Sequence, residues 1–278
     1  MSIMFLKIFL VLVFGFLSLA FLTLLERKVL SFIGLRLGPN KVLYLGLFQP
    51  IFDAIKISNK QTNMLSNYSF FYFYFSSFFL IFFSLLFWFM NFYEPKTLFI
   101  GNSSIFLLVL LTFHTIFSMF IAWSSIGKFS VIASLRITSQ LISYEGVIYM
   151  IILFFFIIYF SYNFYMMYFN VLFFFFPFIF FFWIFSILSE LGRTPFDFGE
   201  SESELVSGFN LEYGSVFFSF IFMAEYSSIS FFSLLSSYLF FYDFFFFFFF
   251  FFFGFVLFCL VYVLILFYMF VENLFFLF

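Results

Sequence analysis

Three glutamates of this sequence fall at or inside long apolar stretches, where carboxylates are unusual. Glu145 lies at the head of one stretch, Glu190 at the end of another, and Glu225 well inside a third. At ~1.5 Å of rise per helical residue, Glu225 would lie near ~18 Å depth, close to the middle of a bilayer. Ionising an acid there costs about 2.5–3.5 kcal/mol on insertion scales. We therefore expect these acids to face a water-filled cavity, where they can take up and release protons.

Segment 191–212 adds a second group of carboxylates next to these stretches. Its acidic residues are Asp197, Glu200, Glu202, Glu204 and Glu212, and its one basic residue is Arg193. A solvated acidic loop is the usual explanation for such a run. Because Glu190 and Glu225 bracket this segment within apolar stretches, we favour a proton path instead.

A second unusual segment, 26–67, is basic. It opens with Glu26-Arg27-Lys28, and Gly38-Pro39-Asn40 is typical of a turn. Pro50 begins a short amphipathic stretch, with Ile51, Phe52 and Ile55 on one side and Asp53 and Lys56 on the other. Two interpretations stay open: an interfacial helix with basic anchors, or a lid over a cavity at membrane level.

The composition excludes a soluble enzyme and a nucleic-acid-binding protein. Of 278 residues, 68 are Phe, 66% are apolar and only 9% are charged, against about a quarter in soluble domains. The formal net charge is −2, with no basic run. One Cys (Cys259) and one His (His114) provide no disulfide, metal, haem or iron–sulfur ligand set. His114, beside Thr115 and Ser118, is predicted to be a hydrogen-bonded structural residue, so redox centres must belong to partners.

Seven apolar stretches are long enough to span a bilayer, which needs about 20 helical residues. They cover about 3–25, 68–92, 104–126, 142–165, 170–190, 213–240 and 244–270. The sequence therefore predicts a single all-α, multi-pass membrane domain, 1–278.

Alternating spans place loops 26–67, 127–141 and 191–212 on one face. That face holds nine of the eleven basic residues, and Lys7 and Lys96 are the exceptions, which indicates the inner side. The first stretch ends in Glu26-Arg27-Lys28, like a stop-transfer flank, so we expect a retained helix.

Three blocks of these loops resemble the NADH:ubiquinone oxidoreductase chain 1 family, the quinone-channel membrane subunits of respiratory complex I. The first block comprises Leu25 to Leu30, Leu35-Arg36, Gly38-Pro39-Asn40, Leu47 to Pro50, Asp53-Ala54 and Lys56. The second comprises Leu135-Arg136, Gln140 and Ile142 to Glu145. The third comprises Arg193 to Asp197, Glu202 to Asn210, Glu212-Tyr213 and Met223 to Tyr226. The resemblance runs from about residue 20 to about residue 230.

The resemblance implies a tunnel that admits ubiquinone from the bilayer and an acidic path toward proton-pumping subunits. Residues near the tunnel would be Glu26, Arg36, Phe222 and Met223. The acidic path would consist of Glu145, Glu190, Glu200, Glu204 and Glu225, and the loop between would be ordered by Arg193 and Asp197. Ubiquinone would be the substrate, with no cofactor bound by this chain. NADH, flavin and iron–sulfur clusters would belong to partners in the peripheral quinone module, and other partners would be membrane-arm subunits.

The resemblance also implies the mitochondrial inner membrane, with the charged loops facing the matrix. The excess of Phe agrees with a T-rich organelle genome, because Phe codons are T-rich.

The sequence departs from the family at Gln61, where an acid is usual. No Lys or Arg follows Arg193, where the family continues into a basic loop and an eighth helix. Three alternatives stay open: a subunit of a related hydrogenase-type complex, a stand-alone proton or ion transporter, or a degraded chain. The transporter would favour inverted repeats and broken helices, and the sequence shows neither.

Overall fold

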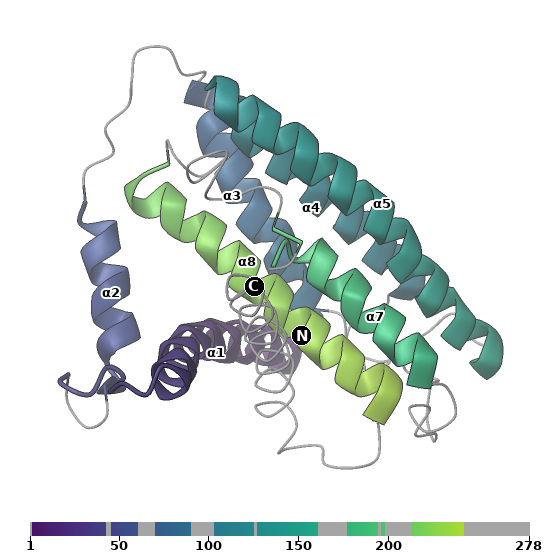
Figure 1. Cartoon of the computed structure of the whole chain (residues 1–278), viewed down its shortest axis with the longest axis horizontal. Coiled ribbons are helices and arrows are strands. Elements are labelled where there is room, and N and C mark those ends of the chain that lie inside the picture. Colours follow the sequence, from purple (N-terminus) through teal and green to yellow (C-terminus); the bar gives the residue numbers. More distant parts are fainter. Residues whose placement is uncertain are drawn as a thin grey trace, which may run out of the picture.

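The computed structural model describes residues 2–42, 46–60, 70–89, 103–124, 127–160, 177–193, 196–197 and 213–241. The secondary structure within these residues is entirely helical (Figure 1). The elements are α1 (Ser2–Ile33), α2 (Gln49–Ser58), α3 (Phe70–Leu86), the 3-10 turn η2 (Phe87–Phe89), α4 (Ser103–Ser124), α5 (Lys128–Tyr159), α7 (Pro177–Glu190) and α8 (Ser215–Phe241). The predicted span 244–270 lies outside the described residues.

Five of these helices form the body of the molecule. Helix α3 packs against both α4 and α8, α4 packs against α5, and α5 packs against α7. Helices α1 and α2 contact each other and α8, at one side of this body (Figure 1). Stretches within three of the helices, Ser104–Ser124, Lys128–Tyr159 and Ser215–Ser236, are long and apolar enough to cross a membrane. The chain is an all-α, multi-pass membrane protein.

Aromatic side chains pack with Leu and Ile in the core between these helices. Phe87 and Phe231 stack with 4.7 Å between ring centroids, and the Trp183 side chain is fully buried. Phe240 packs edge-on against both Phe155 and Phe180. Such offset and edge-to-face pairs add to the energy of burying the ring surface. The abundance of Phe therefore provides interhelical packing as well as lipid-facing surface.

Serine side chains in the helices satisfy their own hydroxyl groups. The hydroxyl of Ser84 donates to the carbonyl of Ile81 at 2.8 Å, and that of Ser227 donates to the carbonyl of Ala224 at 2.8 Å. In a bilayer, water cannot compensate an unpaired polar group, so hydroxyls bond to the preceding helical turn. Buried serines are consequently compatible with an apolar bundle.

Two helices extend beyond the sequence-based boundaries. Helix α1 continues to Ile33, past the predicted end at 25, and α5 begins at Lys128, so most of 127–141 is helical and not a loop. No Gly or Pro interrupts residues 128–141, and this polar half continues the helix of the following span. At ~1.5 Å per residue, the 32 residues of α5 measure about 48 Å, more than the ~30 Å hydrocarbon core. Helix α2 begins at Gln49, and Pro50 lies in its first turn. This agrees with the helix start that Pro50 predicts.

Candidate functional site

A cavity of about 130 Å³ lies among α3, α4, α5, α7 and α8. Its polar lining is formed by His114, Gln140, Glu190, Arg193, Asp197 and Glu225, with the Ser118 and Ser189 side chains beside them. Four of these, Glu190, Arg193, Asp197 and Glu225, are residues that the sequence predicted to act together. The structure therefore brings carboxylates from two helices and one turn to a single internal space.

The end of α7 determines where Glu190 lies. The N–H of Gly192 donates to the carbonyl of Ser189, and the N–H of Arg193 donates to the carbonyl of Leu188 at 3.1 Å. This pair of bonds is a Schellman motif, which requires a left-handed residue, and Gly192 adopts φ +56° without steric cost. The motif ends the helix directly after Glu190 and turns the chain so that Arg193 lines the same cavity.

Glu190 is the most deeply enclosed acid of the cavity. Its side chain is 6% exposed, and neither carboxylate oxygen has a hydrogen-bond partner among the described residues. Glu145 of α5, also buried at 8% exposure, interacts electrostatically with Glu190 but does not line the cavity. Buried polar atoms in proteins are nearly always paired with protein or water. Within the described residues, the two oxygens of Glu190 therefore lack the pairing that buried polar atoms usually have.

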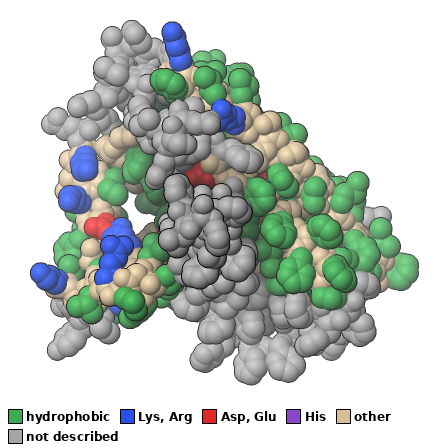
Figure 2. Space-filling view, viewed as in Figure 1, with side chains coloured by type: hydrophobic (Ala, Val, Ile, Leu, Met, Phe, Trp, Pro, Cys, Tyr) green, Lys and Arg blue, Asp and Glu red, His purple; other side chains and the backbone are tan. Residues whose placement is uncertain are grey.

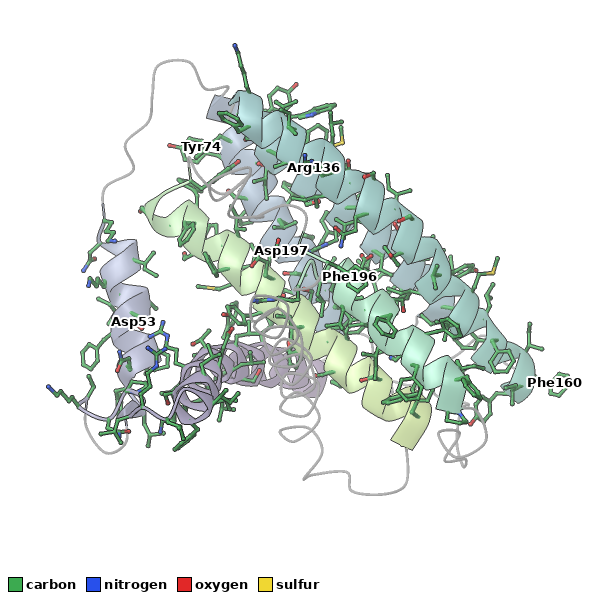
Figure 3. The ribbon with its side chains drawn as sticks, in the orientation of Figure 1. Asp53, Tyr74, Arg136, Phe160, Phe196 and Asp197 are labelled. Carbon is green, nitrogen blue, oxygen red and sulfur yellow. The ribbon has the colours of Figure 1, made fainter. Side chains whose placement is uncertain are left out.

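Gln140 fixes the turn after α7 to α5. Its side-chain N–H₂ donates to the carbonyls of Ser189 and Phe196, both at 2.7 Å. The Phe196 ring also packs against Tyr144, with 5.9 Å between centroids. Figure 3 shows Phe196 and Asp197 beside the end of α7, between α8 and α5. The segment that carries Arg193 and Asp197 is therefore held from α5.

Arg193 connects the cavity with α8 and α1. Its Cζ lies 5.5 Å from the centroid of the Tyr226 ring, and the Tyr226 hydroxyl donates to Oε2 of Glu26 at 2.6 Å. Burial alone lowers the pKa of the Arg193 guanidinium, but the charge of Glu225 and other negative groups around it raise that pKa above its ordinary value. The guanidinium is therefore positively charged at any physiological pH. A cation stands between the acids of the cavity and Glu26.

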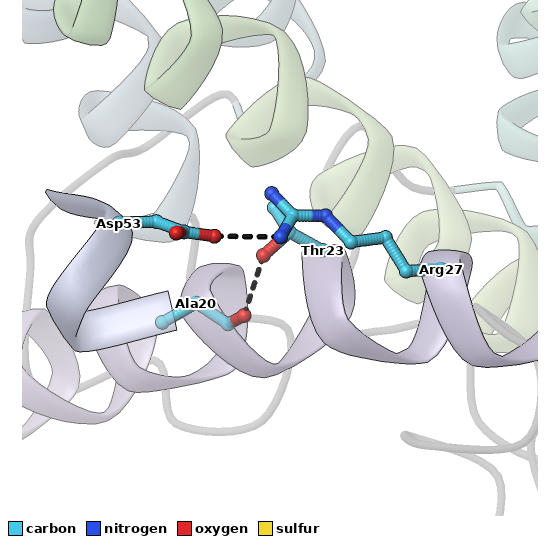
Figure 4. Close-up of polar contacts among 4 residues, drawn as sticks. All are labelled: Ala20, Thr23, Arg27 and Asp53. Atoms are coloured by element: carbon cyan, nitrogen blue, oxygen red, sulfur yellow. Dashed lines mark hydrogen bonds and ion pairs between the residues drawn. The ribbon is translucent and has the colours of Figure 1, made fainter. Parts of the chain in front are cut away.

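Basic side chains gather on the α1–α2 side of the molecule (Figure 2). One of them, Arg27, forms an ion pair with Asp53 of α2 at 2.6 Å, next to the Thr23 hydroxyl, which donates to the carbonyl of Ala20 (Figure 4). This pair links α1 to α2 at an exposed position. Arg36 is exposed in the turn after α1 and does not line the cavity.

The remaining predicted residues have different surroundings. Phe222 stacks on Tyr226, with 6.5 Å between centroids, whereas Met223 packs against the core cluster that contains Ile221 and Ala224. Glu200 and Glu204 lie outside the described residues.

Sequence reasoning assigned no role to Tyr226, Gln140 or His114, although all three contribute here. Tyr226 directly follows Glu225, and that position beside an intramembrane acid is the signal that could have identified it.

The sequence of this chain is similar to those of known proteins. The family model described as NADH dehydrogenase matches residues 6–276. The NADH-ubiquinone oxidoreductase chain 1 of Aedes aegypti is 42% identical over 230 residues, covering 80% of this chain and 72% of the relative. The protein of the same name from Artemia franciscana is 37% identical over 261 residues, covering 91% and 84%. That from Rhipicephalus sanguineus is 39% identical over 240 residues, covering 85% and 77%.

Proposed function

This chain belongs to the NADH dehydrogenase family, and we propose that it is the membrane subunit that couples ubiquinone reduction to proton transfer in NADH–ubiquinone oxidoreductase. In this proposal the chain acts enzymatically only within the complex, as part of an NADH:ubiquinone reductase that translocates protons. It provides a route for ubiquinone from the bilayer and a path for protons away from the quinone site.

The proposed quinone side lies where α1, α2 and α8 meet. Figure 2 shows a hollow between α2 and α8 on this side. Glu26 and Phe222 both contact Tyr226 of α8, and we place these two residues beside the hollow, with Arg36 and Met223 at its margin. A ligand site of mostly apolar lining with few polar groups suits an isoprenoid tail and a quinone headgroup. A reduced quinone must also gain protons, so carboxylates near the headgroup have a chemical role.

The proposed acidic path begins on the other side of Tyr226. Glu225 and Glu190 line the cavity, and Glu145 continues the series into α5 through its interaction with Glu190. Arg193 and Asp197 hold the turn between them, and Glu200 and Glu204 belong to the same path in this proposal. Interacting carboxylates titrate as a group, so a proton bound by one of them changes the apparent pKa values of the others.

The other parts of the reaction are assigned to partners. With one Cys and one His, the sequence has no ligand set for an iron–sulfur cluster. We therefore place NADH oxidation, flavin and iron–sulfur clusters on partner subunits of the peripheral quinone module, with further contacts to membrane-arm subunits. The proposed location is the mitochondrial inner membrane, with the basic loops facing the matrix, because short basic loops stay on the inner side.

One observation supports this function most strongly. Glu190, whose two oxygens have no hydrogen-bond partner in the part of the chain that the structure describes, shares a cavity with Arg193. The Arg193 guanidinium lies over the ring of Tyr226, which binds Glu26. The test is to solubilise native membranes in mild detergent, isolate assemblies by an antibody to this chain, and assay NADH oxidation with ubiquinone. We expect the chain and this activity to purify together. Purification of the chain away from all NADH-oxidising activity would contradict the proposal.

A further inference from the structure

His114 of α4 lines the acidic cavity although it belongs to no predicted path. It lies one helical turn before Ser118, and both side chains face the cavity. The Ser118 hydroxyl is already bonded to the carbonyl of Thr115 at 2.7 Å. The Nε2 atom of His114 is buried and has no hydrogen-bond partner among the described residues. The imidazole is therefore enclosed beside the acids with one nitrogen unsatisfied.

The cavity therefore has three buried polar atoms without partners in the described part of the chain: Nε2 of His114 and both carboxylate oxygens of Glu190. Its volume of about 130 Å³ is well above the ~10–15 Å³ that a cavity needs to hold one water molecule. A buried water needs two to four polar partners, and the polar side chains that line this cavity can provide them. Water is consequently the occupant that fits the size and polarity of this space.

We propose that His114 exchanges protons with Glu190 through water in this cavity. In the step, the protonated Glu190 carboxyl gives its proton to a water, and this water gives one of its own protons to Nε2. The products are a carboxylate, an imidazolium and an unchanged water. The inference rests on the proposed function and extends it, because it adds a residue of α4 to a path otherwise formed by acids of α5, α7 and α8.

The surroundings of the cavity are suited to this exchange. The charged groups facing His114 are Glu190, Arg193 and Asp197 at the end of α7 and Glu225 of α8. Helix α5 contributes the uncharged Gln140, and α3 contributes the apolar Leu80. Burial disfavours a positive charge on the imidazole, and the carboxylates that face it oppose that effect. The imidazolium is therefore a transient state of the exchange, not the resting form of His114.

Complexes carrying His114→Gln and His114→Phe test this role. Gln keeps hydrogen-bonding groups but does not titrate, and Phe keeps only the ring. We expect both variants to lower ubiquinone reduction and proton release several-fold and to change the pH dependence of the rate. NADH oxidation with a soluble artificial acceptor should remain normal. The rates of ubiquinone reduction and proton release should be divided by this rate, which corrects for the amount of assembled complex. Thr112→Val, on the same helix but away from the cavity, is the matched control.

Two results would overturn the inference. If His114→Gln keeps the wild-type rate and pH profile while His114→Phe does not, the histidine is only a hydrogen-bond partner for water. If both variants are normal, it has no part in proton transfer. Glu190→Gln, measured in parallel, separates this failure from that of the proposed function. If Glu190→Gln reduces ubiquinone slowly while the His114 variants are normal, only the role of the histidine is overturned. If Glu190→Gln is itself normal, the acidic path is overturned.

Discussion

Tyr226 donates a 2.6 Å hydrogen bond to Glu26, a residue 200 positions earlier in the chain. The same tyrosine ring lies under the guanidinium of Arg193, which lines the acidic cavity. One side chain of α8 thus contacts both the proposed quinone side and the turn of the proposed proton path. The hydroxyl binds Glu26 and also interacts with Arg193, and the ring face lies against Arg193, so Tyr226→Phe removes the hydroxyl contacts and keeps the ring contact.

Replacing Tyr226 with Phe removes the hydroxyl and keeps the ring under Arg193. The Glu26 carboxylate then loses a short charge-assisted hydrogen bond, a type worth about 1.5–3 kcal/mol. We expect ubiquinone reduction to fall several-fold while NADH oxidation by an artificial acceptor is unchanged. Tyr72→Phe, at a side chain that is 54% exposed, is the control. Equal ubiquinone rates in both variants would show that the contact with Glu26 does not serve the reaction.

Replacing Arg193 with Gln removes the cation that faces Glu225 and Tyr226. Because the half-buried Glu225 carboxylate then loses the cation that faces it, we expect a loss of about 3 kcal/mol in stability, the lower end of the range for buried pairs, together with loss of ubiquinone reduction. The measurement is the thermal inactivation temperature of the assembled complex. Arg27→Gln is the matched control, since its ion pair with Asp53 is exposed and should contribute at most ~1 kcal/mol. An equally small effect of both substitutions would contradict the role given to Arg193.

Replacing Gln140 with Leu keeps the side-chain volume but removes the donor from the Phe196 carbonyl and leaves the Ser189 carbonyl with only the Gly192 N–H. Leaving a buried acceptor unsatisfied costs about 1–3 kcal/mol. We expect faster hydrogen exchange at residues 191–193 and slower ubiquinone reduction, because the turn is then held less firmly. The neighbouring exposed Ser139→Ala should leave both unchanged. Unaltered exchange at 191–193 in Gln140→Leu would contradict this account of the turn.

Replacing Tyr213 with Phe tests the packing of the start of α8. The hydroxyl lies 2.6 Å from the Ser124 hydroxyl and donates to the carbonyl of Ile121 at 3.0 Å, and the ring stacks on Phe73 at 4.1 Å. The substitution retains the stack and removes the polar contacts, so we expect about 1–2 kcal/mol of lost stability. Thermal inactivation measures this loss. Unchanged ubiquinone turnover at low temperature should accompany it, because Tyr213 lies outside the acidic cavity.

The sequence was most informative where local chemistry decides the structure. Pro50 predicts the start of α2, and long apolar stretches predict the helices of the bundle. The helix at 128–141 was missed because its polar residues resemble a loop when read without the span that follows. The left-handed conformation of Leu35, φ +50°, has no signal in its residue type.

Within the candidate site, the acids could be found because carboxylates at lipid depth are rare. That Glu190, Arg193 and Glu225 line one cavity depends on how α7 and α8 pack, which no local pattern contains. The contact between Tyr226 and Glu26 joins residues too far apart in the sequence for any spacing rule. The proton-path and quinone roles of these residues stay predictions.

The central claim is that the buried acids carry protons while electrons reach ubiquinone. The direct measurement compares wild-type complex with Glu190→Gln and Glu225→Gln in sealed vesicles, recording ubiquinone reduction, proton release and NADH oxidation by an artificial acceptor. We predict that both variants lose most ubiquinone turnover and proton release but oxidise NADH with the artificial acceptor at the wild-type rate. Wild-type ubiquinone turnover and proton release in both variants would contradict the account.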